Sequence, residues 1–153
     1  MTVINEFAPA KINLTLRVLG QRPDGYHELE SLVAFADIGD NLTLDVSKPI
    51  GVTVSGPFAG SIAGANLVEA ALRRLEIEAP QLQLGAVHLK KNLPVAAGIG
   101  GGSADAAAVI RAVTSANLEH VEDVNWLDFA QKLGADRLGR VAAMDHPAED
   151  LAA

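Results

Sequence analysis

Residues 91–108 read KNLPVAAGIGGGSADAAA, a glycine-rich loop that runs straight into an alanine-rich segment. Alanine has the highest helix propensity of the ordinary residues, so the sequence predicts a helix over residues 104–117. The amides that begin a helix lack partners within it and lie at the positive end of its dipole. Glycines at this point let phosphate oxygens approach those amides, because no Cβ stands in the way. The stretch therefore predicts a phosphate-binding loop, with a flexible turn as the alternative interpretation.

The loop differs from two common nucleotide-binding motifs. Neither Lys-Ser nor Lys-Thr follows the glycines, which excludes a P-loop of the G-x-x-x-x-G-K-[ST] type. The dinucleotide fingerprint G-x-G-x-x-G/A is also excluded, because Gly98 and Gly100 fit its first two glycines but Ser103 takes its last position. The expected ligand is therefore a phosphate group that backbone amides hold without either signature.

The segments on either side of the loop predict two more helices and a strand region. Asn66 has the character of an N-cap, and the apolar spacing after it predicts a helix that ends near residues 78–80. Apolar residues between Leu82 and Leu89 predict one interrupted strand or a pair of short strands. A last helix is expected over residues 124–133, with Gly134 as its C′ cap.

The amino-terminal part of the chain has the period of two that is typical of strands. Polar and apolar residues alternate strictly from Lys11 to Val18, which predicts a half-buried strand. Turn-forming residues at 20–25 separate this strand from an extended segment at 26–35. A β-hairpin is the expected result.

A second group of turn-forming residues, at 37–41, precedes two further alternating segments at 42–46 and 52–54. The first part of the chain therefore predicts a mostly antiparallel sheet. No repeat and no linker divides residues 1–136, so we expect one α+β domain. Residues 137–153 have no clear periodicity, and we interpret them as a weakly ordered tail.

The composition of the 153 residues excludes several classes of protein. Lys and Arg number 12 against 19 Asp and Glu, which gives a net charge of −7, and 4% of the residues are aromatic. A nucleic-acid groove needs a basic face, and single strands need stacking rings, so we expect no nucleic-acid partner. The lack of cysteine excludes disulfides and cysteine-ligated metals. No window approaches the roughly 20 apolar residues of a membrane span and no signal peptide is found, so a cytoplasmic protein without a membrane partner is expected.

Two charged residues are candidates for catalysis. Asp136 follows the last predicted helix, and as a general base it would accept a proton from a bound hydroxyl group. A lysine close to it, such as Lys11, would keep the carboxylate ionised and offset the charge that develops. The alternatives are an ordinary turn carboxylate and a solvated lysine at a strand edge.

Tyr26 and His27 are candidates for ligand binding, because a ring beside an imidazole can stack on a nucleobase and hydrogen-bond it. A surface tyrosine next to a turn is the alternative. Lys90 and Lys91 form a small basic spot, for which simple solvation is the alternative. The four histidines lack the spacing of metal ligands, so no metal site is assigned.

Five motifs occur in a fixed order along the chain. They are PAKINL at 9–14, RPDGYH at 22–27, KNLP at 91–94, GIGGGSA at 98–104 and LGAD at 133–136. Together they resemble the GHMP kinase superfamily, and the RPDGYH run is similar to the branch that phosphorylates a cytidylated methylerythritol rather than to galactokinases or mevalonate kinases. The resemblance covers residues 8 to 136. It implies an α+β fold of the ribosomal protein S5 domain 2-like type, with a mostly antiparallel sheet and helices on one face.

The resemblance implies a reaction as well as a fold. A phosphoryl group would pass from ATP to the 2-hydroxyl of the cytidylated methylerythritol, a step of the non-mevalonate route to isoprenoid precursors. Asp136 would be the base and Lys11 its charged partner. Mg²⁺ is expected with ATP, although no protein ligand for it is assigned.

Binding residues follow from the same resemblance. Asn13 would lie near the reacting end of the substrate, while Tyr26 and His27 would hold the cytosine with Lys91 close by. The ATP-binding residues would be Asn66, Pro94, Val95, Ala96, Ala97, Gly98, Ile99, Gly100, Gly101, Gly102, Ser103 and Ala104.

The chain departs from this family after Asp136. Arg137 and Leu138 stand where the family continues with Val-Pro and a strand, and the C-terminal domain with its second glycine-rich motif is not found. We therefore expect a truncated chain whose substrate cleft lacks one wall and whose turnover is impaired. The alternative function is a non-catalytic nucleotide-binding or interaction module. An RNA-binding relative of the same fold is disfavoured by the net charge of −7.

Overall fold

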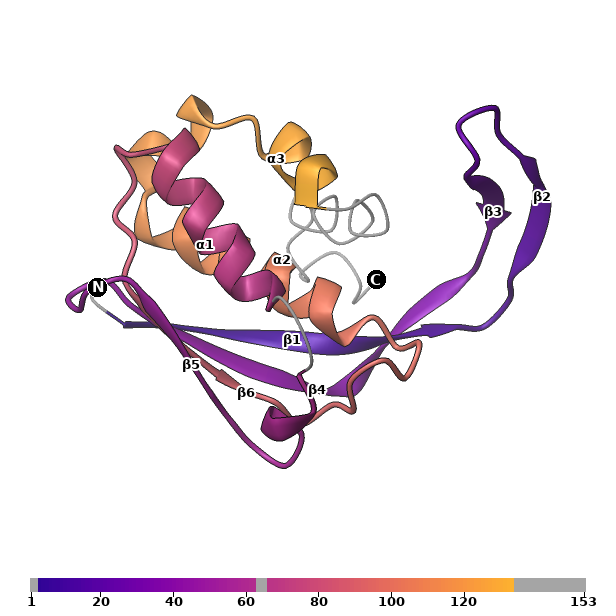
Figure 1. The fold of residues 1–153 in the computed structure, drawn as a ribbon, viewed down its shortest axis with the longest axis horizontal. Helices are drawn as coiled ribbons and strands as arrows, with labels where there is room; N and C mark the ends of the chain where they lie inside the picture. The colour runs from indigo at the N-terminus through magenta and orange to yellow at the C-terminus, as the bar shows by residue number, and fades with distance from the viewer. Residues whose placement is uncertain (1–2, 63–65, 134–153) are drawn as a thin grey trace, which may run out of the picture.

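The computed structural model describes residues 3–62 and 66–133. Its three α-helices all lie on one side of a four-stranded sheet (Figure 1). The helices are α1 (Leu67–Glu78), α2 (Gly101–Ala116) and α3 (Trp126–Leu133). Two short 3-10 helices, η1 (Ala59–Ser61) and η2 (Leu118–Asp123), lie in the connections. This arrangement confirms the predicted α+β class, with helices on one face of the sheet.

The sheet is mostly antiparallel, as predicted. Its strands, in spatial order, are β1 (Val3–Asn13), β4 (Val33–Asp45), β6 (Ala86–Lys90) and β5 (Gly51–Ser55). The β1–β4 and β4–β6 pairs are antiparallel, whereas β5 and β6 run parallel because α1 connects them. The region between Leu82 and Leu89 thus contributes one strand rather than a pair.

The predicted hairpin forms a separate two-stranded arm. Strands β2 (Arg17–Gln21) and β3 (His27–Glu30) pair antiparallel, and they extend away from the body of the molecule (Figure 1). The arm corrects one prediction, because the apolar side of the alternating segment is not half-buried. Ile12, Leu14, Leu16 and Val18 are 45%, 59%, 57% and 63% exposed. Alternation identifies residues that share a face, but no helix or second sheet of the described residues covers this one.

The turn predicted at 37–41 is wrong, since β4 continues through it. A Cβ on Gly39 would stand 2.3 Å from the carbonyl oxygen of Ala8, so glycine is required here for the close approach of β4 to β1. The register of that pair shifts between Pro9 and Lys11. Asp40, which follows, is fully buried. Gly39 and Asp40 resemble turn residues, but glycine is needed for a close contact between strands and Asp40 is buried in the interior, so the chain does not reverse here.

The helices agree more closely with the sequence. Asn66 caps α1, with its side-chain oxygen 3.0 Å from the amide of Val68, and α1 ends at Glu78 as expected. Helix α2 begins at Gly101, within the glycine run, rather than at residue 104. The last predicted helix, over residues 124–133, forms as α3 from Trp126 onward, and η2 precedes it without having been predicted. Its expected cap Gly134 lies outside the described residues.

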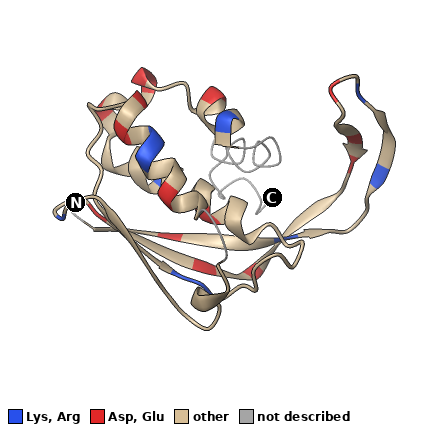
Figure 2. Ribbon diagram, viewed as in Figure 1, with Lys and Arg blue, Asp and Glu red and all other residues tan. Residues whose placement is uncertain are grey.

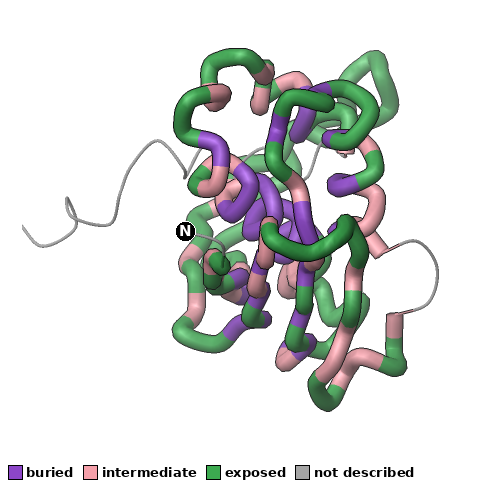
Figure 3. The backbone as a smooth tube through the Cα atoms, turned by 90° about the vertical axis from the view of Figure 1, so that its left-hand side faces the viewer, coloured by how far each residue is buried: buried purple, intermediate pink, exposed green. Residues whose placement is uncertain are grey.

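The core lies between the sheet and α2. Buried residues gather in the interior of the body in Figure 3, and α2 is buried on nearly every side from Ser103 to Ile110. Large side chains of β4 and α1 pack against it, among them Leu42, Leu44 and Leu72. Small alanines let α2 approach the sheet closely. None of the helices in the described ranges is long and apolar enough to cross a membrane.

The two sides of α1 give a direct test of this packing. Leu75 is fully buried, whereas Ile77 of the same helix is 79% exposed. We expect Leu75→Ala to lower the free energy of unfolding by about 2–5 kcal/mol, through lost burial and a residual cavity. Ile77→Ala, the matched control, should change it by about 0.5 kcal/mol or less. Urea denaturation followed by circular dichroism measures both, and equal losses would contradict the placement of α1.

Candidate functional site

The glycine-rich loop wraps around the beginning of α2. Residues 94–98 are exposed, and Ala96, Gly98 and Gly100 all have left-handed backbone conformations, with φ of 60°, 71° and 66°. Gly100 is the N-cap of α2, and its carbonyl oxygen accepts the first helical hydrogen bond, from the amide of Ala104 at 3.0 Å. The loop therefore leads directly into the first turn of α2, whose amides lie at the positive end of the helix dipole. This is the geometry that an anion-binding loop requires.

Lys11 lies beside this loop. Its backbone amide donates to the carbonyl oxygen of Ile99 at 2.9 Å, which joins β1 to the loop. Its side chain is half-buried, and the ammonium group forms no ion pair or hydrogen bond with any residue that the structure describes. The backbone of Lys11 is thus fixed beside the glycine-rich loop, and its ammonium has no carboxylate partner among the described residues.

The beginning of α1 lies next to the beginning of α2. A Cβ on Gly102 would stand 3.2 Å from Cδ1 of Leu67, the first residue of α1. Asn66 immediately precedes it, and its side-chain oxygen is used to cap the helix. The structure brings Asn66 close to the loop, while its contact with a nucleotide stays a prediction.

The residues predicted to hold the substrate lie on and near the arm. Tyr26 is 63% exposed and His27 is exposed as well. Several hydrogen bonds hold the turn that presents them, among them those from the Arg22 amide to the Tyr26 carbonyl at 2.6 Å and from the Tyr26 amide to Asp24 at 3.1 Å. Asn13, at the base of the arm, donates to the Ser31 hydroxyl at 2.8 Å. The arm stands apart from α2 in Figure 1.

Lys91 departs from its prediction. The expected basic spot is wrong for this residue, because its side chain is 4% exposed and its ammonium lies between two carboxylates. Nζ is 2.5 Å from Oδ2 of Asp40 and 2.8 Å from Oδ2 of Asp105. A lysine held in this way does not extend to a cytosine beside Tyr26. We call Asp40, Lys91 and Asp105 the buried triad.

Burial and charge act in opposite directions within the buried triad. Burial raises the pKa of Asp105 to about 7, although the ion pair with Lys91 opposes this, and the neighbouring Asp40 carboxylate adds to the rise. Burial by itself would lower the pKa of Lys91, but its bonds to Asp105 and Asp40 outweigh it, and the pKa is raised. Oδ1 of Asp105 is buried without a hydrogen-bond partner. The triad therefore holds an ammonium that stays charged and a carboxyl group that titrates near neutrality.

Asp40 and Asp105 were not predicted from the sequence. Asp105 is the one charged residue between Ser103 and Ile110, a stretch that is otherwise apolar apart from its first residue. A carboxylate inside a buried helix needs a cationic partner, so this position was a usable signal. Asp40 was missed because it lies within residues 37–41, which were predicted to form a turn.

Two expectations cannot be compared with the structure. Asp136 lies outside the described residues. For Mg²⁺, the described residues contain no group of three or more His, Asp or Glu side chains that could hold a metal ion.

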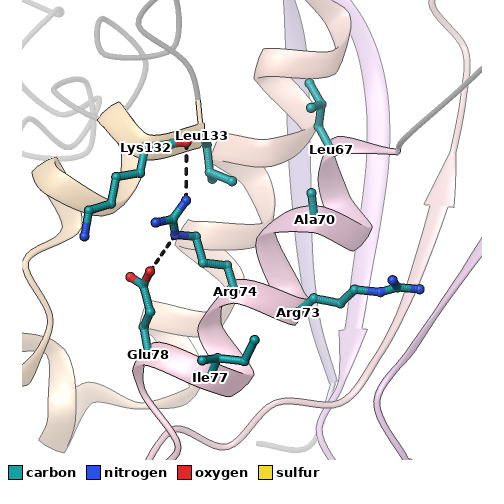
Figure 4. Close-up of a pocket in the computed structure, with 8 residues that line it drawn as sticks. All are labelled: Leu67, Ala70, Arg73, Arg74, Ile77, Glu78, Lys132 and Leu133. Carbon is teal, nitrogen blue, oxygen red and sulfur yellow. Dashed lines mark hydrogen bonds and ion pairs between the residues drawn. The ribbon is translucent and has the colours of Figure 1, made fainter.

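A groove between α1 and α3 is distinct from the loop (Figure 4). Arg74 donates to Glu78 at 2.7 Å and to the carbonyl oxygen of Lys132 at 3.4 Å. Arg73 pairs with Glu69, and Lys132 pairs with Asp128. All three cations are thus already neutralised, which makes the groove a poor anion site. Across the described residues, basic residues are interspersed with acidic ones (Figure 2).

Comparison with known proteins gives a consistent result. Residues 66–151 match the family described as GHMP kinases N terminal domain. A 4-diphosphocytidyl-2-C-methyl-D-erythritol kinase from Methylobacterium radiotolerans is 53% identical over 139 residues, which are 89% of this chain and 48% of that protein. The kinase of the same name from Rhodopseudomonas palustris is 53% identical over 138 residues, covering 89% of this chain and 46% of its own length. The chain spans about half the length of the curated relatives it matches.

Solved structures give the same picture. A crystal structure of 4-(cytidine 5'-diphospho)-2C-methyl-D-erythritol kinase has a TM-score of 0.70 and 36% identity, over 92% of this chain and 49% of that one. Homoserine kinase from Cytophaga hutchinsonii has a TM-score of 0.62 over 94% of this chain and 46% of its own. At 20% identity the second similarity is one of fold alone.

The left-handed N-cap of α2 can be tested without a ligand. We expect Gly100→Ala to lower the free energy of unfolding by about 1–2 kcal/mol, because alanine is strained at positive φ. Gly101→Ala is the matched control, since a Cβ there would meet its nearest atoms at 3.5 Å and longer. Its effect should be about 0.5 kcal/mol or less. Chemical denaturation measures both, and a Gly100→Ala variant as stable as its neighbour would contradict the loop geometry.

Proposed function

The chain belongs to the GHMP kinase family, and on this basis we propose that it binds ATP and takes part in phosphoryl transfer to an alcohol. One observation carries the proposal: the exposed loop leads into the N-terminus of α2, and the backbone amide of Lys11 is bonded to it at Ile99. Phosphoryl transfer depends mainly on positioning and on electrostatic stabilisation of the phosphates. Helix amides, together with the Lys11 ammonium, which has no partner among the described residues, supply both.

The proposed alcohol is 4-diphosphocytidyl-2-C-methyl-D-erythritol, phosphorylated at its 2-hydroxyl in the non-mevalonate route to isoprenoids. Relatives that are 53% identical carry the name of this kinase. Tyr26 and His27 are proposed to hold the cytosine, which agrees with their exposure on the arm and with their ability to stack and hydrogen-bond. Asn13 is proposed to contact the reacting end. Lys91 is not included, because its ammonium is buried.

In the proposed reaction, the hydroxyl oxygen of the substrate bonds to the γ-phosphorus of ATP, and ADP leaves. Asp136 accepts the proton that this hydroxyl loses. Lys11 keeps this carboxylate ionised and neutralises charge on the transferring group. The role of Asp136 rests on the resemblance of its LGAD motif alone. Mg²⁺ would offset the charge of the phosphates, and we propose that phosphate oxygens and water hold it.

The domain boundaries and the setting of the reaction are part of the proposal. Residues 1–136 are proposed as the ATP-binding domain, and the relatives carry about as much sequence again. We propose that binding needs only this chain, whereas efficient turnover needs the wall of the cleft that the rest of a full-length kinase supplies. The cytoplasm, where ATP and small phosphorylated substrates are available, is the proposed location.

Ligand-dependent stability tests the proposal on the chain itself. A non-hydrolysable ATP analogue, the β,γ-imidotriphosphate, with Mg²⁺ should raise the melting temperature, since a native-state ligand at 100 times its dissociation constant adds about 2.7 kcal/mol. The cytidylated substrate should do the same, while methylerythritol phosphate should not. Differential scanning calorimetry measures these shifts. Tyr26→Ala should remove the shift by the cytidylated substrate and keep that by the nucleotide.

Glu28→Ala, on the same arm, is the matched control and should change neither shift. Any phosphoryl transfer that the chain performs should be abolished by Asp136→Asn, with the nucleotide shift preserved. A shift by the nucleotide alone would favour a non-catalytic nucleotide-binding module. No shift by either ligand would contradict the proposed function.

A further inference from the structure

The buried triad is connected to both ends of the phosphate loop. At the entering end, Oδ1 of Asp40 accepts hydrogen bonds from the amides of Asn92 and Leu93, at 2.6 and 2.8 Å. At the leaving end, Lys91 holds Asp105 of α2. The same ammonium also donates a hydrogen bond to Asp40, so the Lys91 side chain links the two ends of the loop.

The buried triad lies directly beneath the first turn of α2. A Cβ on Gly101 would stand 3.5 Å from Nζ of Lys91 and 3.7 Å from Oδ2 of Asp40. Gly101 follows the N-cap, so the charges of the triad act at short range on the amides of the first turn of α2, where the loop ends. The triad is thus in the position to control both the shape of the loop and the electrostatic potential within it.

Stability alone does not explain these charges. Two carboxylates share one ammonium, and Oδ1 of Asp105 is buried with no partner. Replacing a buried ion-pair cluster with apolar residues is often neutral or stabilising, and an unsatisfied buried oxygen is a cost. A helix of alanines would pack here without Asp105.

We propose that Asp40, Lys91 and Asp105 are positioning residues for the phosphate loop, and that the charge on Asp105 sets the affinity of the loop for phosphate groups. This inference rests on the proposed binding of ATP. The carboxyl group does not touch the ligand: it acts through Lys91 and through the field at the start of α2.

The charged groups on the elements around Asp105 are either members of the buried triad or lie farther from it. Asp40 of β4 and Lys91, which follows β6, are the charged groups that act directly on Asp105. On β1, Glu6 pairs with Arg111 farther along α2, and Lys11 lies at the loop. The charges of α1 nearest its beginning, Glu69 and Arg73, pair with each other on the surface.

The direction of the pH dependence follows from the burial of Asp105. Its pKa is raised from the ordinary 3.8 to about 7, so the folded chain retains a proton that the unfolded chain has lost. The stability from this group is present at low pH and is lost as pH rises through about 7. Over the same interval the triad gains a negative charge beneath the loop, which repels phosphate. Binding of phosphate therefore favours the protonated carboxyl, and nucleotide binding takes up a proton.

Calorimetric titration with the β,γ-imidotriphosphate of adenosine tests the coupling, at pH 6 and pH 8. From pH 6 to pH 8 the affinity of the unaltered chain should fall more than that of Asp105→Asn. The extra fall should be about fivefold or more, a size typical of coupling between sites. The ligand itself titrates in this range, but it does so equally for both proteins. Asp37→Asn removes an exposed carboxylate of β4 and should behave as the unaltered chain. Repeating the titration in buffers of different ionisation enthalpy should reveal proton uptake, which Asp105→Asn abolishes.

Lys91 tests the positioning role. Lys91→Met should weaken binding of the same analogue by about tenfold or more, because it removes the cation beneath the loop and the link between Asp40 and Asp105. A change of this size is typical of coupling between sites. Lys91→Arg, which keeps the cation, should restore part of the affinity. If Lys91→Met fails to fold by circular dichroism, the Asp105→Asn comparison decides the matter.

Two outcomes separate this inference from the proposed function. Absence of analogue binding by the unaltered chain at both pH values would overturn the proposed function, and this inference with it. Binding by the unaltered chain, with the same pH dependence for Asp105→Asn, would overturn the coupling alone.

Discussion

The ammonium group of Lys91 lies between the carboxylates of Asp40 and Asp105, and the placement of the glycine loop follows from these two contacts. Each group would be expensive to bury alone, so the three are stable in the interior only together. Asp40 belongs to β4, Lys91 follows β6, and Asp105 belongs to α2. The pairing of β4 with β6 therefore brings two members together, and the docking of α2 brings the third. The position of the loop is thereby set by the sheet and α2, while its own glycines permit its left-handed backbone.

Local signals in the sequence were sufficient for the elements that local interactions determine. The cap at Asn66, the apolar face after it and the change from glycines to alanines all act within a few residues, and the helices form where these signals lie. The turn predicted at 37–41 failed because Gly39 serves a contact with Ala8, which is distant in sequence. Lys91 failed for a related reason, since a lysine next to Lys90 indicates a basic surface unless its buried partners are known. Sequence reasoning found the loop itself and missed the charges that hold it.

The arm illustrates a different limit. Period-two alternation predicts one strand from Lys11 to Val18, but the structure divides it, since β1 ends at Asn13 and β2 begins at Arg17. The turn-forming residues at 20–25 correctly indicate a hairpin. Alternation sorts side chains onto two faces, but it carries no information on what lies opposite either face. Exposed apolar residues continue from the arm onto β4, where Val33 and Phe35 are 41% and 47% exposed. The two parts of the candidate site differ in how far their surroundings are defined. The loop is held by hydrogen bonds to β1 and β4, whereas the two strands of the arm are held by hydrogen bonds to each other.

The position of β6 constrains how the chain can acquire its structure. This strand lies between β4 and β5 and pairs with both, yet it is the last strand of the sheet in chain order. Until residues 86–90 have been synthesised, β5 has no neighbour and β4 has an unpaired edge facing it. Pairings between distant segments form slowly, and open edges promote association between chains. During synthesis the nascent chain thus exposes two unsatisfied strand edges for as long as the ribosome takes to add α1 and β6, and this interval is the period of greatest risk of aggregation.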